Sequence, residues 1–261
     1  MTTDKRLAIV TGASRGIGYE LARIAGSHHY DLLIAAQHGP LLEDAASHLR
    51  EQGVGVETVA ADLAVMEEVD RLVDAVKDRP VDLLFANAGH GLGKGFLDQD
   101  FKDIRHVVDT NITGTIYLIH RVGRLMREQG YGRILITGSI AGAMPAPFHA
   151  VYHATKAFID NFSSALRNEL EDTGVSVTCL MPGATDTNFF ARAGLENSAI
   201  IDQATDDPAD VAQTGWDAMT RGDDHVVHGV KNKLQVAFAN VAPASMVASQ
   251  NRKQNEPGSR S

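Results

Sequence analysis

Short apolar runs rich in β-branched residues alternate along the chain with longer segments whose apolar residues recur at helical spacing. In 64–78, for example, Val69, Leu72 and Val76 fall on one face of a helix. Parallel strands need a long connection, so a strand, a helix and a second strand form the repeat of a parallel sheet. The pattern predicts strands at 7–10, 31–36, 54–60, 81–86, 133–137, 175–181 and 225–228, and helices at 17–27, 41–52, 64–78, 101–128, 151–172 and 208–220.

This alternation predicts the α/β fold class, with a single doubly wound, Rossmann-like parallel sheet of about seven strands and helices on both faces. The chain has 261 residues, near the upper size that one hydrophobic core supports. We therefore expect one domain over residues 1–248. The polar residues 249–261 are expected to form a flexible tail.

Two segments depart from this regular pattern. Segment 182–205 fits neither period, yet it contains Phe189, Phe190 and Leu195 among turn-forming residues, which predicts a mobile flap over a site. Segment 226–247 carries many apolar positions. Its pattern is equally consistent with core, with a subunit interface and with a cover over a substrate.

Composition and charge narrow the classes of function. Hydrophobic residues make up 44% and charged residues 22% of the chain, as in ordinary globular proteins. The net charge is −9 and there is no dense run of Lys and Arg, so we expect small-molecule partners, with no nucleic acid and no membrane. Cys179 lies in an apolar run and is expected to be a buried structural thiol. The polar start of the sequence predicts no signal peptide, so we expect a cytoplasmic protein.

A glycine-rich turn follows the first predicted strand and opens an amphipathic helix. In it, Gly12 permits a tight turn, Gly16 lets backbone N–H groups approach a pyrophosphate, and Gly18 lets the helix pack closely on the sheet. The positive end of the helix dipole adds attraction for an anion. This arrangement predicts a dinucleotide cofactor.

The end of the second strand bears on which dinucleotide is bound. An NAD-selective site places an acidic residue there to bind the ribose hydroxyls. This strand ends in Ala36, Gln37 and His38, and Arg15 in the glycine turn is placed to pair with a 2′-phosphate. We expect NADP(H) to be preferred. NAD(H) stays as the alternative, because a second basic residue is absent.

Tyr152 and Lys156 stand four residues apart on a predicted helix, hence on one face. A tyrosine titrates near pH ~10, so it is a poor base at neutral pH unless a cation stabilises the phenolate. Lys156 is placed to be that cation. Ser139, at the end of the fifth strand, is placed to hold a substrate oxygen beside Tyr152.

Together these motifs resemble the short-chain dehydrogenase/reductase family over roughly residues 5–228, in the family's order and spacing. The resemblance implies an oxidoreductase that moves a hydride between NADP(H) and a carbonyl or secondary alcohol. Tyr152 would donate or accept the proton, its pKa lowered by Lys156, and Asn111 would hold a relay water. The family often has a second asparagine where this chain has Ala86. The implied catalytic residues are Asn111, Ser139, Tyr152 and Lys156.

The resemblance also implies the cofactor contacts and the assembly. Asp62 would contact the adenine, Asn87 and Gly89 would line the nicotinamide side, and Thr187 would bind the carboxamide. A homodimer or homotetramer would form through the helices 101–128 and 151–172. The implied cofactor-binding residues are Thr11, Gly12, Ser14, Arg15, Gly16, Ile17, Gly18, Asp62, Asn87, Gly89, Tyr152, Lys156, Pro182, Gly183 and Thr187.

The remaining candidates concern the substrate and the rival functions. The segments 90–97, 140–148 and 188–201 are mostly small, apolar or aromatic and predict a pocket for a modest, largely uncharged substrate. His149 and His153 are expected at its lip without a chemical role. The eleven histidines show no ligand spacing, so no metal site is expected. The alternative function is a non-catalytic dinucleotide-binding sensor, which would keep the glycine turn and dispense with Ser139, Tyr152 and Lys156.

Overall fold

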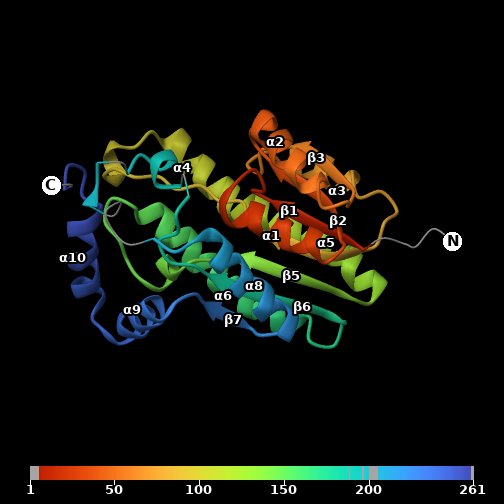
Figure 1. The fold of residues 1–261 in the computed structure, drawn as a ribbon. Helices are drawn as coiled ribbons and strands as arrows, with labels where there is room; N and C mark the ends of the chain where they lie inside the picture. The colour runs from red at the N-terminus through yellow and green to blue at the C-terminus, as the bar shows by residue number, and fades with distance from the viewer. Residues whose placement is uncertain (1–5, 188, 196, 200–204, 260–261) are drawn as a thin grey trace.

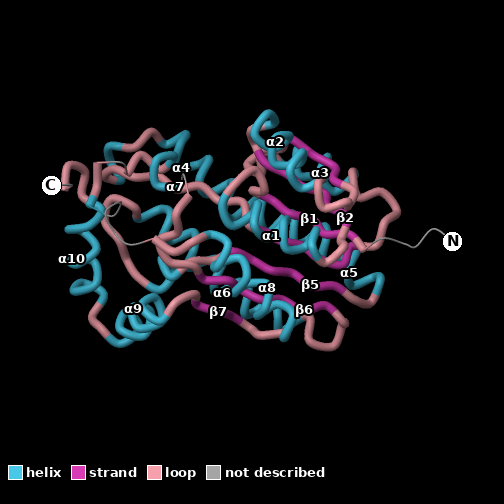
Figure 2. The backbone as a smooth tube through the Cα atoms, in the orientation of Figure 1, coloured by secondary structure: helices cyan, strands magenta, loops and turns pink. Residues whose placement is uncertain are grey.

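The computed structural model describes residues 6–187, 189–195, 197–199 and 205–259. Seven parallel strands form one sheet in the order β3-β2-β1-β4-β5-β6-β7 (Figures 1 and 2). This confirms the predicted doubly wound α/β fold. The strands are β1 (Leu7–Thr11), β2 (Asp31–Ala36), β3 (Val56–Ala60), β4 (Val81–Ala86), β5 (Gly132–Thr137), β6 (Val175–Met181) and β7 (His225–Val227).

Helices cover both faces of the sheet (Figure 1). On one face lie α1 (Gly16–Ser27), α2 (Gly39–Arg50) and α8 (Pro208–Arg221), and on the other lie α3 (Met66–Asp74), α5 (Thr115–Gln129) and α6 (Ala150–Glu169). No helix in the described part of the chain is long and apolar enough to cross a bilayer.

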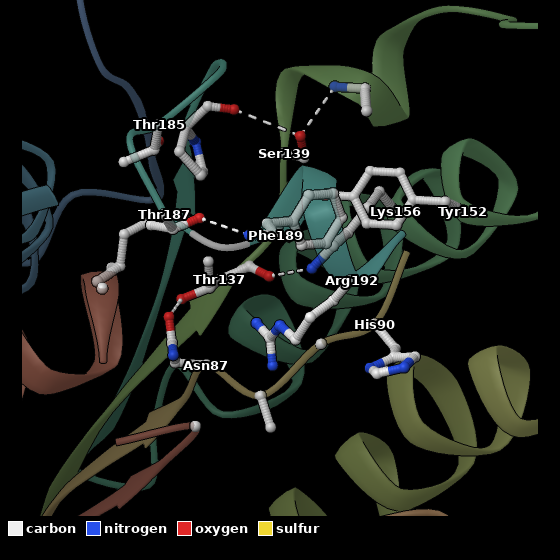
Figure 3. A pocket seen from close by; sticks show the side chains of 18 of the residues that line it. Asn87, His90, Thr137, Ser139, Tyr152, Lys156, Thr185, Thr187, Phe189 and Arg192 are labelled. Carbon is white, nitrogen blue, oxygen red and sulfur yellow. Dashed lines mark hydrogen bonds between the residues drawn. The ribbon is translucent and has the colours of Figure 1, made fainter. Parts of the chain in front are cut away.

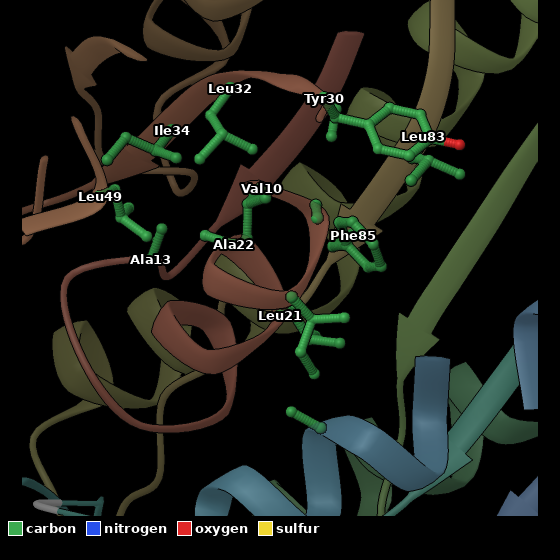
Figure 4. Packing of buried hydrophobic residues seen from close by; sticks show 14 of the residues in the cluster. Val10, Ala13, Leu21, Ala22, Tyr30, Leu32, Ile34, Leu49, Leu83 and Phe85 are labelled. Atoms are coloured by element: carbon green, nitrogen blue, oxygen red, sulfur yellow. The ribbon is translucent and has the colours of Figure 1, made fainter. Parts of the chain in front are cut away.

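Alternate residues of the central strands feed two hydrophobic cores. In β1, Ala8 and Val10 face α1, whereas Leu7 and Ile9 face the helices of the other face. Val10 packs in the same cluster as Leu21 of α1 (Figure 4). Both faces of the sheet are therefore shielded from water, which accounts for the continuous apolar runs in the sequence.

The helix predicted over 101–128 is interrupted. It consists of α4 (Phe101–Val108), a π-helical turn at Asp109–Gly114, and α5. Gly114 lies against the Leu63 carbonyl, where an added Cβ would come within 1.9 Å of the oxygen. The apolar periodicity continues through this turn, so the sequence pattern does not reveal it, although such turns are frequent at functional sites.

The end of the chain differs from the predicted flexible tail. Residues after β7 form α9 (Val230–Val241) and α10 (Ala244–Asn255), at the left of Figure 1. In α10, the Asn251 side-chain amide donates to the Pro145 carbonyl at 3.0 Å and the Asn255 amide to the Pro147 carbonyl at 3.3 Å. Asn251 and Asn255 are thus buried and bind loop carbonyls, while Ser249, Gln250, Arg252 and Lys253 on the other side of α10 are exposed.

Ending the chain after Ala248 is therefore expected to destabilise it. The deletion removes both asparagine contacts and the hydrogen bond from the Ser198 hydroxyl to the Asn255 carbonyl. At about 1 kcal/mol per hydrogen bond and ~2–4 °C per kcal/mol, the thermal midpoint should fall by roughly 5–10 °C. Calorimetry measures it, with the exposed Lys253→Ala as control. An unchanged thermal midpoint would instead support the predicted flexible tail.

Candidate active site

A cavity of about 610 Å³ opens at the carboxyl ends of the strands. The chain crosses to opposite faces after β1 and β4, and such a switch point is where doubly wound sheets bind ligands. Most of the predicted site residues line this one cavity. They are Thr11, Gly12, Ser14, Arg15, Gly16, Ile17, Asp62, Asn87, Gly89, Ser139, Tyr152, Lys156, Pro182, Gly183 and Thr187.

The glycine turn leaves an anion-binding position at the start of α1. Gly12 and Gly16 adopt φ of +68° and +59°, and a Cβ on Gly16 would lie 2.7 Å from the Thr187 methyl. The N-cap residue Arg15 makes no side-chain cap, and the first turn of α1 holds no acidic residue. The N–H groups of this turn are therefore available to an anion, as the pyrophosphate of a dinucleotide requires.

Asn87 joins three strand ends beneath the turn. Its Nδ2 donates to the Thr11 carbonyl at 3.1 Å, and its Oδ1 accepts from the Thr137 hydroxyl at 3.1 Å (Figure 3). Gly18 lies behind the cavity wall, where a Cβ would be 2.3 Å from the Gly12 carbonyl oxygen. Both residues thus hold the shape of the cradle, and Gly18 itself does not line the cavity.

The far end of the cavity is lined by polar groups from β2 and β3. Gln37 Nε2 donates to Asp62 Oδ2 at 2.9 Å, and the Ala64 N–H donates to Asp62 Oδ1 at 2.9 Å. Ala36, Gln37 and His38 supply no carboxylate there. The glycine turn contributes the cation of Arg15 to the cavity.

Tyr152 and Lys156 lie on one face of α6 and both enter the cavity (Figure 3). Lys156 is 5% exposed, and its Nζ donates to the Thr137 carbonyl at 2.7 Å. The same nitrogen lies 5.8 Å from the centre of the Tyr152 ring. The predicted shared face of the two side chains is therefore present.

The predicted lowering of the tyrosine pKa by Lys156 is not found in this arrangement. Desolvation raises the pKa of Tyr152 to about 12, a hydrogen bond with Ser139 lowers it, and the charge of Asp160 raises it. Desolvation has the largest effect, so the pKa of Tyr152 is raised. The Lys156 ammonium binds the Thr137 carbonyl. Tyr152 is consequently protonated at neutral pH, as a proton donor must be.

Ser139 is fixed by the backbone on both sides. Its Oγ donates to the Pro182 carbonyl at 3.3 Å and accepts from the Ala141 N–H at 3.1 Å, and it caps a short 3-10 turn at Ile140–Ala143. The side chain is buried. Its hydroxyl therefore has a set position beside Tyr152.

Comparison with known proteins identifies the group to which this chain is related. The family model described as short chain dehydrogenase matches residues 6–197. The chain belongs to the short-chain dehydrogenase family. It is therefore an NAD(P)-dependent oxidoreductase.

Individual relatives agree with this assignment. A putative ketoacyl reductase of Streptomyces coelicolor is 33% identical, over 80% of this chain and 82% of its own length. An uncharacterized oxidoreductase of Staphylococcus aureus is 31% identical, over 84% and 92%. A solved short-chain dehydrogenase of Sphingobium yanoikuyae in complex with NADPH has 26% identity and a TM-score of 0.80, and covers 92% of this chain and 97% of that one.

In this short-chain dehydrogenase Asn111 lies behind the cavity wall. The amide of Asn111 accepts from the His90 N–H at 2.7 Å and donates to the His90 carbonyl at 2.8 Å and to Thr155 Oγ1 at 3.0 Å. Its Oδ1 and the Lys156 Nζ would each lie 3.6 Å from a Cβ on Gly89. Asn111 thus fixes the loop that follows β4, and its Oδ1 and the Lys156 Nζ both approach Gly89 in this loop.

The substrate end of the cavity differs in part from the predicted segments. Leu97 is 92% exposed, so the predicted wall at 90–97 does not extend that far. Instead α9 and α10 contribute Gln235, Asn251 and Asn255. Part of segment 226–247 thus lines the cavity, and its Val236 and Ala239 pack against the cluster of Ile140, Met144 and Val247.

The sequence reasoning missed Arg192, on the short flap helix α7 (Phe189–Arg192), which reaches into the cavity (Figure 3). Desolvation and the positive charge of Arg15 lower the pKa of Arg192. Two guanidinium groups from different walls thus share the space above the glycine turn. No periodicity within 182–205 signals this residue.

Asp160 was also missed. Its Oδ1 accepts from the Ser139 N–H at 3.3 Å and from the Cys179 thiol at 3.6 Å, while its Oδ2 is buried with no partner among the described residues. The carboxyl group fits only because 138 and 142 are glycines, where a Cβ would lie 1.9 and 2.0 Å from its oxygens. The available signal was its spacing of four residues from Lys156.

Among described residues no group of His, Cys, Asp and Glu could hold a metal ion.

Asp160→Asn is expected to stabilise the enzyme at neutral pH. Desolvation raises the pKa of Asp160 from 3.8 to about 6, so between these values the folded state keeps a proton that the unfolded state loses. The parent therefore loses stability as pH rises through this window, by roughly 2 kcal/mol, and the variant does not. Urea unfolding at pH ~4 and ~7 measures the difference. The exposed Asp172→Asn is the control, and a constant offset between variant and parent at both pH values would contradict the prediction.

Proposed function

We propose that this enzyme interconverts a carbonyl compound and its secondary alcohol with NADP(H), and that Tyr152 carries the proton. One observation supports this above all: the glycine cradle, the buried Ser139 and Lys156, and the half-buried Tyr152 line a single cavity. A dinucleotide sensor would need the cradle alone. The burial of a lysine beside a tyrosine is costly without a chemical role.

The dinucleotide fits the residues present. The uncapped start of α1 and Arg15 would hold the pyrophosphate and phosphate oxygens, and Asp62 the adenine side. Asn87, Gly89, Pro182, Gly183 and Thr187 would surround the nicotinamide, with Lys156 at its ribose. When bound, the cofactor supplies or accepts the hydride.

The chain's own residues handle the proton. In the reductive direction Tyr152 O–H donates its proton to the substrate oxygen, which becomes the alcohol as the hydride reaches the carbon. The Ser139 hydroxyl would turn its proton from the Pro182 carbonyl to that oxygen and hold it by a second hydrogen bond. The Lys156 ammonium stabilises the phenolate that forms, and Asn111 supports a water through which the proton is replaced. Oxidation runs the same steps in reverse.

Preference for NADP(H) over NAD(H) rests on charge. The end of β2 lacks the carboxylate that would repel a 2′-phosphate, and Arg15 on the glycine turn offers a planar, permanently charged partner. The Sphingobium yanoikuyae relative is described in complex with NADPH. Arg192 adds a second cation above the same turn.

Substitution of Tyr152 by Phe tests the chemistry. Removing the hydroxyl should lower NADPH-dependent carbonyl reduction by about 100-fold or more, because proton transfer by a positioned side chain is worth ~10²–10⁴. Nucleotide binding should persist, since the ring and Lys156 remain. A spectrophotometric assay over a carbonyl panel gives the rate, and fluorescence titration gives the binding. Equal turnover by parent and variant would remove the proposed role.

Substitution of Arg15 by Ala tests the cofactor preference. The parent should bind NADPH more tightly than NADH, and the variant should lose roughly tenfold for NADPH with little change for NADH, because only NADPH carries the 2′-phosphate. Fluorescence titration of both nucleotides measures the two dissociation constants. Exposed Arg127→Ala, on α5 away from the cavity, is the control. Tighter binding of NADH by the parent would overturn the assignment.

A further inference from the structure

His149, directly before the catalytic helix α6, is not at the pocket lip as its sequence position suggested. It lines the cavity, is only 2% exposed, and stacks on Tyr152 with ring centres 4.6 Å apart and planes 14° apart. His149 Nε2 is buried without a hydrogen-bond partner among the described residues. Buried polar atoms are nearly always paired, so this one calls for an explanation.

The neighbours of the ring indicate what would reach it. The ring of Phe189, on the flap helix, lies 5.0 Å from the Tyr152 ring (Figure 3). It also lies 6.2 Å from the His149 ring, so it borders both. A substrate that displaces Phe189 from the Tyr152 ring would also displace it from the His149 ring.

The charge of His149 limits the partner further. Desolvation and the positive potential of His153 lower the pKa of His149 to about 3. A neutral imidazole offers one N–H donor and one acceptor. It suits an uncharged oxygen, such as a hydroxyl or a carbonyl, and gives a carboxylate no charge to pair with.

Taking the proposed function as its basis, we propose that His149 recognises a second, uncharged oxygen of the substrate, placed close to the carbonyl on which Tyr152 acts. Because the two rings are in stacking contact, the two bound oxygens are separated by only a few bonds. A β-keto ester or β-hydroxy ketone has this spacing. A simple monofunctional ketone would leave the imidazole unpaired.

The neighbouring His153 provides a matched comparison. Its ring lies 5.4 Å from that of His149, but its Nδ1 is already bound to the Met144 carbonyl at 2.8 Å. His153 is therefore satisfied within the protein, and replacing it should not distinguish one substrate from another.

The test compares two substrates in the full-length enzyme with NADPH: ethyl acetoacetate and a straight-chain methyl ketone of equal length without the ester oxygens. The parent should prefer the keto ester. His149→Phe, which keeps the stacked ring, should lower kcat/KM for the keto ester by about tenfold or more and that for the plain ketone by less than about twofold. His149→Gln, which keeps hydrogen bonding, should recover part of the preference.

Each other result counts against the proposal. No preference in the parent, or equal losses for both substrates in His149→Phe, would overturn it. A His153→Phe variant with the same selective loss would overturn it as well, by showing that disturbed packing is the cause. If His149→Phe does not fold, the ratio of the two substrates in His149→Gln and in a His149→Leu variant decides the same question. Turnover of neither substrate by the parent, or full activity of Tyr152→Phe, would instead remove the proposed function on which this inference rests.

Discussion

The contact between the Lys156 ammonium and the backbone oxygen of Thr137 is the interaction on which the site depends. A buried cation must be compensated, and here the end of β5 supplies the compensation at 2.7 Å. This contact ties α6 to the sheet and so sets how far Tyr152 stands from the strand ends. Asn87, which accepts from the hydroxyl of the same threonine, extends the connection to β1 and the glycine turn. The cradle and the proton-transfer groups are therefore held by one continuous set of hydrogen bonds.

Much of this arrangement follows from the sequence. The strands at 31–36, 81–86 and 175–181 match the predicted bounds, because fully buried parallel strands are continuous apolar runs with clear ends. The spacing of Tyr152 and Lys156 also determines a shared helix face. Local periodicity is enough for both kinds of prediction, and no distant contact is needed.

Other features depend on contacts that a linear pattern does not contain. The amides of α10 read as a solvated tail because their partners, the carbonyls of Pro145 and Pro147, lie more than a hundred residues away. The pKa of Tyr152 follows from how completely water is excluded, and spacing alone does not give this. Asp160 owes its place to two glycines on another element. In each case the residue type alone does not predict how the polar side chain behaves, because its behaviour depends on tertiary contacts.

The last two helices, α9 and α10, add to the cavity from a part of the chain that follows all the strands. The glycine cradle and the side chains of Ser139, Tyr152 and Lys156 all precede β7, whereas α9 and α10 add Gln235, Asn251 and Asn255 to the cavity. One contiguous stretch at the carboxyl end thus forms one wall of the cavity. Recombination at a single crossover after β7 would exchange this wall as a cassette, altering which molecules enter while the inherited redox apparatus stays the same.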